Sequence, residues 1–384
     1  MKMRFLALLL ALGLTTSMVG CQSAEKEAET STATETQATA EADANTSATD
    51  EDIRVAFVLD CSGTDGSWGQ ANYEAAVNVK ESMGFSDEQC IIMEQIDAYS
   101  PDAESVLEML ATDGYDLIFA CSSGFTDAVS TVAARHPEVY FAQYEGGTAE
   151  NTLAYSVRDY GAIFLCGYAV AQMSEQDQLG FIACQPQAGV IRALNAFSEG
   201  ARYANADATV KVLWMNSWYD PAKEKEATNT LLSEGINAVG FYGGTTAVAT
   251  ACEEAGAYTN GFNVDMSAAG PNAVLTSFVW KWEPVFTQVI EMVQADQWSN
   301  ETVFSSIQEG ACDVVDFNAD IMSAELIADC NAVREMVING EIEVFEGPVY
   351  DNQGNCVLEE GEEFTIEDYV NMVFLLDNVV GELP

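Results

Sequence analysis

The chain has 384 residues, 48% of them hydrophobic, with a mean hydropathy of +0.02, so it can bury a large core and global disorder is excluded. Its 14 basic and 61 acidic residues give a formal charge of −47 at pH 7. Nucleic acid and anionic lipid surfaces would repel such a chain, and we expect neither as a partner.

The first 20 residues have the layout of a secretory signal. "MKMR" is basic, and the apolar stretch "FLALLLALGLTTSMV" is too short for a transmembrane helix. "SMVGC" follows, and this ending resembles the bacterial lipoprotein signal. The resemblance implies cleavage before Cys21 and lipid on its sulfur and new amino group, which would anchor the protein on the extracytoplasmic face of the cell membrane. An ordinary cleavable signal with an incidental cysteine is the alternative.

Residues 21–52 form the next segment, which starts at the lipidated cysteine. Residues 22–52 hold nine acidic residues, one lysine and no large apolar side chain. Such a segment cannot bury surface, so we expect a disordered acidic tether.

From Ile53 onward, short apolar strands alternate with helices, which is the pattern of βαβ units and parallel sheets. We predict strands at "IRVAFVLD", "CIIMEQI", "YDLIFACS" and "EVYFAQYE". The helices between them are expected at residues 68–83 and 102–111 and over "FTDAVSTVAARH".

A second set follows with the same alternation. Helices are expected over "YGAIFLCGYAVAQM" and "AGVIRALNAFSEGARYA" and at 221–233, 245–255 and 283–295. Strands are expected at "LGFIACQ", "TVKVLWMNS", "NAVGFY", "YTNGFNV" and "NAVLTSFVW". A hairpin with its turn at 352–354 and a last helix over 366–380 end the chain. The sequence therefore predicts two parallel-sheet lobes: 53–157, completed by about 272–310, and 158–271, completed by about 311–384.

Nine cysteines remain beside Cys21, and none forms a CxxC pair, so zinc and thioredoxin-like sites are disfavoured. An odd number outside the cytoplasm also argues against a full disulfide framework, although one bridge stays open.

Ligands of open parallel sheets bind beyond the carboxyl ends of the strands. At the predicted strand ends, aromatic rings alternate with carboxylates, hydroxyls and glycines. A flat ligand with polar edges suits this lining, with Trp68 and Trp218 stacked on its two faces. The candidate residues are Asp65, Ser67, Trp68, Ser122, Ser123, Phe125, Tyr144, Glu145, Trp218, Asp220, Gly243, Thr245, Asp265 and Trp280.

Several candidates also have a structural alternative. Asp220 precedes Pro221 and is well placed to cap a helix. Phe125 could be a packing residue, at least one of Trp280 and Trp282 is expected to be, and Trp214 is expected in the core.

No reaction centre is apparent. His136, the single histidine, lies at a predicted helix end away from every strand end, and neither a phosphate loop nor GxSxG occurs. We therefore expect a binding protein without cofactor or metal rather than an enzyme.

The order of these motifs resembles the basic membrane protein family of ABC-transporter substrate-binding lipoproteins, in the purine-nucleoside receptor group and closest to its Med-like branch. The resemblance covers about 53–384 and rests on "DGSWGQANYEA", "YGAIFLCGYAVAQMS", "MNSWYDPAKEKEA" and "VFEGPVYDNQGN". It implies a type I periplasmic-binding fold, in which two lobes close on a ligand in the cleft between them.

The resemblance also implies residue roles. Trp68 and Trp218 stand where the family stacks a purine, Asp65 and Ser67 lie in the first binding loop, and Asp265 stands where nucleoside binders hold ribose hydroxyls. Three positions depart from the pattern: Gly69 replaces an asparagine, Trp280 a lysine and Ser123 an aromatic. These departures affect the polar base contact and part of ribose recognition, so a free purine base is expected to fit better than a nucleoside.

We expect a monomer that delivers this ligand to the permease of an ABC importer. Three alternatives stay open: a sugar-binding protein of the same fold, a regulatory or signalling lipoprotein, and an enzyme acting on nucleosides.

Overall fold

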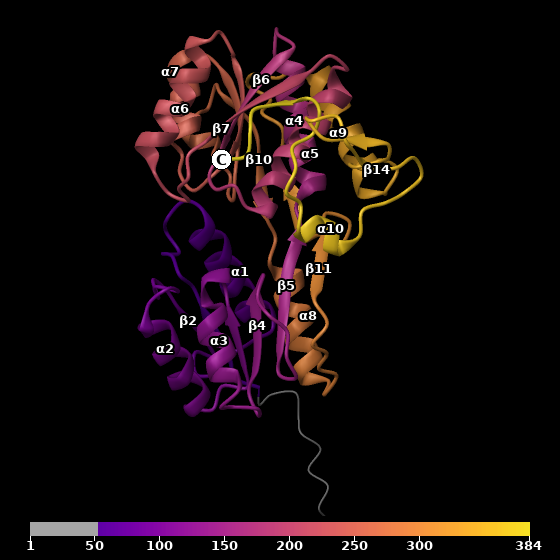
Figure 1. The fold of residues 1–384 in the computed structure, drawn as a ribbon. Coiled ribbons are helices and arrows are strands. Elements are labelled where there is room, and N and C mark those ends of the chain that lie inside the picture. The colour runs from indigo at the N-terminus through magenta and orange to yellow at the C-terminus, as the bar shows by residue number, and fades with distance from the viewer. Residues whose placement is uncertain (1–52) are drawn as a thin grey trace, which may run out of the picture. The chain divides into compact units, whose positions relative to one another are not determined.

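The computed structural model describes residues 53–384 (Figure 1). The expected signal, the lipidation at Cys21 and the expected tether lie outside the described residues.

The first sheet has six parallel strands in the order β11-β5-β4-β3-β1-β2. Apolar runs such as "VAFV" form it because both of its faces are covered. Helices α1 and α8 pack on the face that carries Phe57, and α2 and α3 on the face that carries Ile118. The elements are β1 Val55–Val58, α1 Trp68–Ser82, β2 Cys90–Met93, α2 Pro101–Thr112, β3 Leu117–Ala120, α3 Thr126–Ala133, β4 Tyr140–Tyr144, β5 Thr152–Arg158, α8 Glu283–Gln294 and β11 Val303–Ser306.

The second sheet has the order β12-β10-β9-β8-β6-β7-β15, and only β12 is antiparallel to its neighbour. Figure 1 shows α6 and α7 on one side of this sheet and α4, α5 and α9 on the other. The elements are α4 Tyr160–Met173, β6 Gln178–Ala183, α5 Ala188–Ala204, β7 Thr209–Trp214, α6 Pro221–Ser233, β8 Ala238–Tyr242, α7 Ala247–Ala255, β9 Tyr258–Gly261, β10 Val274–Trp280, β12 Cys312–Val314, α9 Ala324–Ile338 and β15 Val379–Val380.

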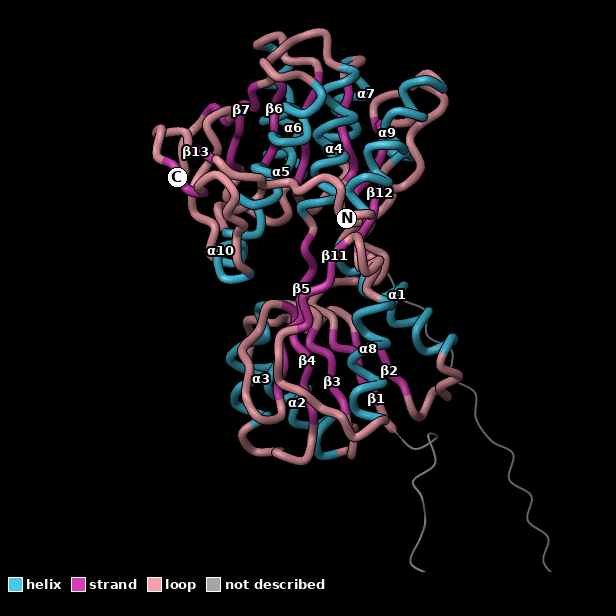
Figure 2. The backbone as a smooth tube through the Cα atoms, turned by 90° about the vertical axis from the view of Figure 1, so that its right-hand side faces the viewer, coloured by secondary structure: helices cyan, strands magenta, loops and turns pink. Residues whose placement is uncertain are grey.

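Each sheet with its helices is called a lobe below. The chain passes between the two sheets after β5, after β10 and between β11 and β12. Figure 2 shows β5 and β11 side by side where they leave the first sheet, and the two strands are paired in parallel. The mixed α/β fold with parallel sheets is confirmed.

Helices α4 and α5 touch backbone to backbone. A Cβ atom at Gly167 would collide with the Phe197 carbonyl oxygen, and one at Gly200 would collide with the Phe164 carbonyl oxygen. Helix α4 is apolar on every side, as expected of a helix buried between a sheet and other helices. The two glycines therefore set the distance between the helices that cover one face of the second sheet.

The C-terminal region differs from the sequence prediction. The expected hairpin is confirmed as β13 Val349–Tyr350 paired with β14 Cys356–Leu358. The expected helix over 366–380 is wrong, because α10 covers only Ile366–Val370 and residues 379–380 form β15. Asn195 on α5 explains the early end: its side-chain amide donates to the Phe374 carbonyl at 2.9 Å and accepts from the Leu376 N–H at 3.1 Å. These bonds take the place of helical ones.

Four other elements were not foreseen. They are β5, α9 and the short strands β11 and β12. Strand β10 belongs to the second sheet, so the return to the first lobe begins after Trp280 rather than near residue 272. Two 3-10 turns, Ser123–Phe125 and Ser267–Ala269, complete the structure.

All nine cysteines of residues 53–384 are free thiols, and seven of them are buried. The one bridge that the sequence left open is therefore not formed in this part of the chain. Buried thiols here pack as small apolar side chains.

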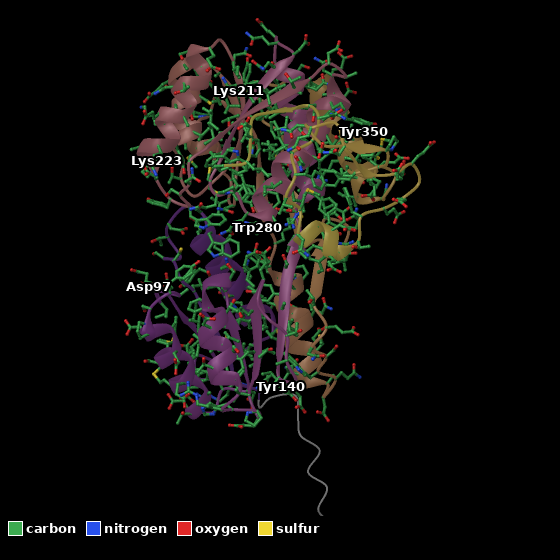
Figure 3. All side chains as sticks on the ribbon, viewed as in Figure 1. Asp97, Tyr140, Lys211, Lys223, Trp280 and Tyr350 are labelled. Carbon is green, nitrogen blue, oxygen red and sulfur yellow. The ribbon has the colours of Figure 1, made fainter. Side chains whose placement is uncertain are left out.

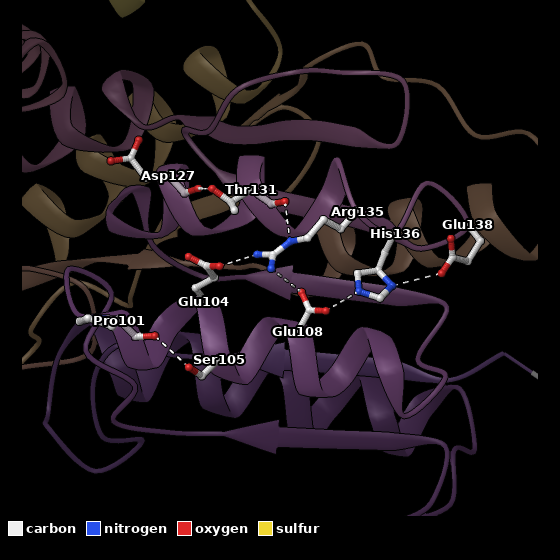
Figure 4. Close-up of polar contacts among 9 residues, drawn as sticks. All are labelled: Pro101, Glu104, Ser105, Glu108, Asp127, Thr131, Arg135, His136 and Glu138. Atoms are coloured by element: carbon white, nitrogen blue, oxygen red, sulfur yellow. Dashed lines mark hydrogen bonds and ion pairs between the residues drawn. The ribbon is translucent and has the colours of Figure 1, made fainter.

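His136 lies in an ionic cluster that joins the end of α3 to α2 (Figure 4). Its Nε2 lies 2.9 Å from Glu108 and its Nδ1 lies 3.2 Å from Glu138. Arg135 contacts Glu104 and Glu108 from the same side. The cluster is structural and lies on the first lobe's outer helices.

This cluster predicts a pH effect on stability. Glu108, and more weakly Glu138, raise the pKa of His136 above its usual value of 6.5. The stabilisation from the charged imidazole is full below about pH 6.5 and is lost as the pH rises through the raised pKa of the folded state. We expect the urea midpoint of the wild type to fall toward that of His136→Gln over this range. A difference between the two proteins that stays constant from pH 5.5 to 8.5 would contradict the assignment.

Candidate ligand-binding site

The carboxyl ends of the two sheets meet through a buried hydrogen bond. Asn263, after β9, donates from Nδ2 to the Ser67 hydroxyl at the start of α1, at 2.7 Å. Its Oδ1 accepts from the indole N–H of Trp280 at 2.6 Å. Figure 3 labels Trp280 at this junction. The strand ends of both lobes therefore face one another here, as ligand sites in open α/β sheets require.

An aromatic cluster lies beside this bond. The ring centre of Trp68 is 4.8 Å from that of Tyr144, and its plane stands edge-on to Trp280 at 5.8 Å and to Trp282 at 5.5 Å. Trp280 and Trp282 stack at 5.0 Å, across the passage from β10 to α8. The Trp68 ring stays partly exposed, and its N–H donates to the Cys121 carbonyl at 3.2 Å. Its position is therefore fixed before any ligand arrives.

Asp65 stabilises the start of α1. Its carboxylate accepts from the N–H groups of Ser67, Gly69 and Gln70 at 2.8, 2.9 and 3.0 Å. These are orphan donors of the first turn of α1, so Asp65 caps the helix that carries Trp68. The contacts of Asp65 in this structure are therefore those of a helix cap, and its contact with a ligand stays a prediction.

The three predicted site residues that follow β3 differ in their exposure to solvent. Ser122 is buried, and its hydroxyl accepts from the Gly124 N–H at 3.2 Å. Ser123 is exposed. Phe125 is 0% exposed and packs between the sheet and α2 and α3, so we correct its expected place in the site to a packing role.

Glu145 is an exposed residue that directly follows β4. It has a φ of +48° and accepts from the Ser156 hydroxyl at 3.2 Å. The residue is accessible to solvent, yet desolvation raises the pKa of its carboxyl, with Arg192 opposing the shift.

Arg192 and Asp159 form a buried ion pair that sequence reasoning missed. Arg192 Nε donates to Asp159 Oδ1 at 3.0 Å, and the guanidinium also donates to the Tyr369 carbonyl. Burial alone would lower the pKa of Arg192, but Asp159 and Glu145 outweigh this and raise it. The two residues lie 33 positions apart, on the start of α4 and on α5, so no local signal could have joined them.

Trp218 and its neighbours occupy the second lobe. Trp218 is 46% exposed and, among residues 53–384, makes no ring contact with the Trp68 cluster. Asp220 accepts from the Lys223 N–H at 3.0 Å, so the capping alternative describes its contact in this structure. Gly243 and Thr245 follow β8 and are buried.

The turn after β9 carries Asp265, a predicted site residue, and Asn263, which the sequence analysis did not single out. Asp265 is exposed, and its carboxylate accepts from the Ser267 N–H at 2.9 Å. Asn263, two residues earlier, is the buried group that faces the first lobe. Its φ of +73° turns the chain in a way that asparagine tolerates better than most residues, and that preference was the available sequence signal.

Within the described part of the chain, no helix combines the length and the apolarity needed to cross a membrane.

Two relatives resemble this chain along most of its length. A putative ABC transporter glucose-binding protein of Haloferax volcanii is 28% identical over 336 residues, covering 87% of this chain and 82% of that protein. A purine-binding protein of Brucella abortus is 29% identical over 336 residues, covering 87% and 95%.

A solved solute-binding protein of an ABC transporter system from Conexibacter woesei has the same fold. Its TM-score is 0.64 at 20% identity, with 77% of this chain and all of that chain covered. The family model of Bmp, described as ABC transporter substrate-binding protein PnrA-like, matches residues 53–347. The chain therefore belongs to the Bmp family of PnrA-like ABC transporter substrate-binding proteins.

Proposed function

We propose that the protein binds a purine nucleoside or a free purine base between its two lobes and delivers it to the permease of an ABC importer. We further propose that lipid on Cys21 holds it at the extracytoplasmic face of the membrane. Family membership already gives the coarser part: a binding protein rather than an enzyme, working outside the cytoplasm with a transporter permease as partner.

The observation that best supports this proposal is the aromatic cluster at the facing strand ends of the two lobes. Trp68 is partly exposed, while contacts with Tyr144, Trp280 and Trp282 hold its ring in place. A fixed ring is a stacking platform for a planar base, and such stacking contributes roughly 1–3 kcal/mol per base. Trp218, exposed after β7 in the other lobe, is the proposed second platform.

Charge restricts the ligand further. The charged groups nearest the cluster are mainly acidic, with Asp60, Glu145 and Asp159 set against Arg192. Asp60 Oδ1 and Asp159 Oδ2 are buried without a hydrogen-bond partner within residues 53–384. Donors on a ligand, such as a ring amine or sugar hydroxyls, would suit them, whereas a phosphate would be repelled.

This arrangement predicts discrimination against nucleotides. Adenosine or adenine is expected to bind in calorimetry, and adenosine monophosphate to bind at least about 100-fold more weakly, since a phosphate placed near the excess of carboxylates costs several kcal/mol. Guanosine and hypoxanthine complete the panel. Affinities weaker than millimolar for all four uncharged purines would refute the purine assignment.

A sugar is the second candidate. The Haloferax volcanii relative is named as a putative glucose-binding protein, and aromatic rings also pack against pyranose faces. Glucose and ribose therefore belong in the same titration. Tight glucose binding with no response to purines would favour the sugar.

The anchor has its own prediction. Cys21→Ala is expected to move the protein from the membrane fraction to the soluble fraction, because only acyl chains on Cys21 are proposed to hold it. Fractionation after a high-salt wash measures this, and circular dichroism checks that the fold is unchanged. Variant protein that stays in the washed membranes would reveal another anchor.

A further inference from the structure

Glu224 occupies an unusual place on α6. The buried residues of this helix are Glu224, Thr228 and Leu231, which form the stripe that faces the sheet. A carboxyl group therefore stands at 0% exposure where an apolar side chain is the usual choice. The neighbours Lys225 and Glu226 are exposed, so the helix is otherwise an ordinary surface helix.

The carboxyl has only one side-chain partner. Its Oε2 accepts a short hydrogen bond from the hydroxyl of Thr245, and that hydroxyl accepts from the Ala247 N–H at 3.1 Å. Within the described chain, Oε1 is buried and makes no hydrogen bond. A charged Glu224 would thus leave an uncompensated oxygen in the interior.

The loop above Glu224 connects it to the proposed stacking residue. A Cβ at Gly243 would lie 3.3 Å from Glu224 Oε1, and a Cβ at Gly244 would lie 2.5 Å from the Trp218 carbonyl oxygen and 3.5 Å from the Tyr219 ring. The Gly243–Gly244 backbone therefore lies between the carboxyl and the Trp218–Tyr219 turn. This close packing gives a route by which a shift of the carboxyl would reach that turn.

We propose that Glu224 is a positioning residue of the second lobe: its buried carboxyl supports the loop at 243–245 and, through it, the turn that presents Trp218, and a proton on Glu224 strengthens that support. In so far as a ligand stacks on Trp218, the proposal rests on the function proposed above.

Burial favours the neutral form of the Glu224 carboxyl. Desolvation raises the pKa of Glu224 to about 7, against the hydrogen bonds from Thr245 and the N–H of Gly244, and Asp220 adds repulsion. Cys184 at the end of β6 is the other titratable group nearby, and burial raises the pKa of its thiol to about 12, so it stays neutral. Lys223 is turned toward Asp220 and the Met215 carbonyl. Support for the loop should therefore weaken as the pH rises through about 7.

The free protein gives the first test. Hydrogen exchange of peptides covering 214–222 and 240–248, corrected for intrinsic rates, is compared at pH 6 and pH 8. Wild-type protection is expected to fall roughly three- to tenfold, and protection in Glu224→Gln, which is neutral and of the same shape, is expected to stay constant. Glu226→Gln removes the same charge from the exposed face of α6 and should behave as the wild type. Equal protection at both pH values in the wild type, or the same fall in Glu224→Gln, would overturn the proposal.

The second test uses adenosine, which does not titrate in this range. Its affinity should fall by up to about tenfold from pH 6 to pH 8.5 in the wild type and stay flat in Glu224→Gln. If adenosine fails to bind at any pH while the exchange result holds, the purine assignment fails and the positioning role stands. Binding that is independent of pH in the wild type would sink the link between Glu224 and the ligand.

Discussion

Gly200→Ala is expected to destabilise the second lobe by about 3 kcal/mol, at the upper end of the range for overpacking. The added methyl group would collide with the carbonyl oxygen of Phe164, and a backbone atom cannot turn aside as a side chain can. Relief would require α4 and α5 to separate along their contact. Alanine's better helix propensity, about 1 kcal/mol, offsets only part of this cost. Urea unfolding followed by far-ultraviolet circular dichroism measures the change.

Gly189→Ala is the matched control. Gly189 lies in the first turn of the same helix, and the nearest atom to a Cβ there is a guanidinium nitrogen of Arg192 at 3.8 Å, an ordinary contact. Stability should be unchanged or slightly raised. Equal effects of the two substitutions would show that helix propensity, rather than the α4–α5 contact, governs both.

Trp68→Ala and Trp218→Ala are each expected to weaken purine binding by roughly 1–3 kcal/mol, about ten- to hundredfold. Each lobe offers one ring, and neither lobe alone can cover both faces of a planar base. The double variant should lose less than the sum, because one open face already admits water. Calorimetric titration with adenine and adenosine measures these losses.

The two positions differ in what a conservative change should restore. Trp218 makes no ring contact with the Trp68 cluster in the described chain, so Trp218→Phe should recover most of the affinity. Trp68→Phe should recover less, since it also loses the hydrogen bond to the Cys121 carbonyl. Trp214→Phe is the control, because the Trp214 indole N–H donates to the Glu382 carbonyl near the chain end and the change should affect stability more than affinity. Undiminished binding in both alanine variants would refute the aromatic sandwich.

The sequence correctly predicted the helices and strands whose bounds are set by neighbouring residues, such as helix caps and apolar runs. Asp220 and Pro221 mark the start of α6, and the structure begins that helix at Pro221. The apolar strand runs gave most of both sheets for the same reason. The pattern over 366–380 failed because Asn195, far away in sequence, binds the backbone that the helix would have used.

The candidate site, too, was predictable only in part from the sequence. The strand ends predicted which side chains lie close together, since Ser67 and Trp280 both bond to Asn263 and the Trp68 ring lies against Trp280. Residue type alone could not separate a carboxylate that caps a helix, such as Asp65, from one with an unpaired buried oxygen, such as Asp60 with its Oδ1. That distinction depends on which backbone N–H groups lie near, and these come from tertiary packing.

The bond between Asn263 and Ser67 joins one lobe to the other, so it favours conformers in which the strand ends of the two lobes lie together. A hydrogen bond is lost within about 1 Å of added separation, so a hinge motion that moves Asn263 that far from Ser67 breaks it. The bond consequently raises the population of the closed conformer relative to the open one. For a ligand that only the closed conformer holds, the apparent dissociation constant equals the intrinsic constant divided by the fraction of molecules that are closed. Asn263 and Ser67 thus influence the apparent affinity for the ligand, and so the ligand concentration at which the protein is half saturated, without having to touch the ligand.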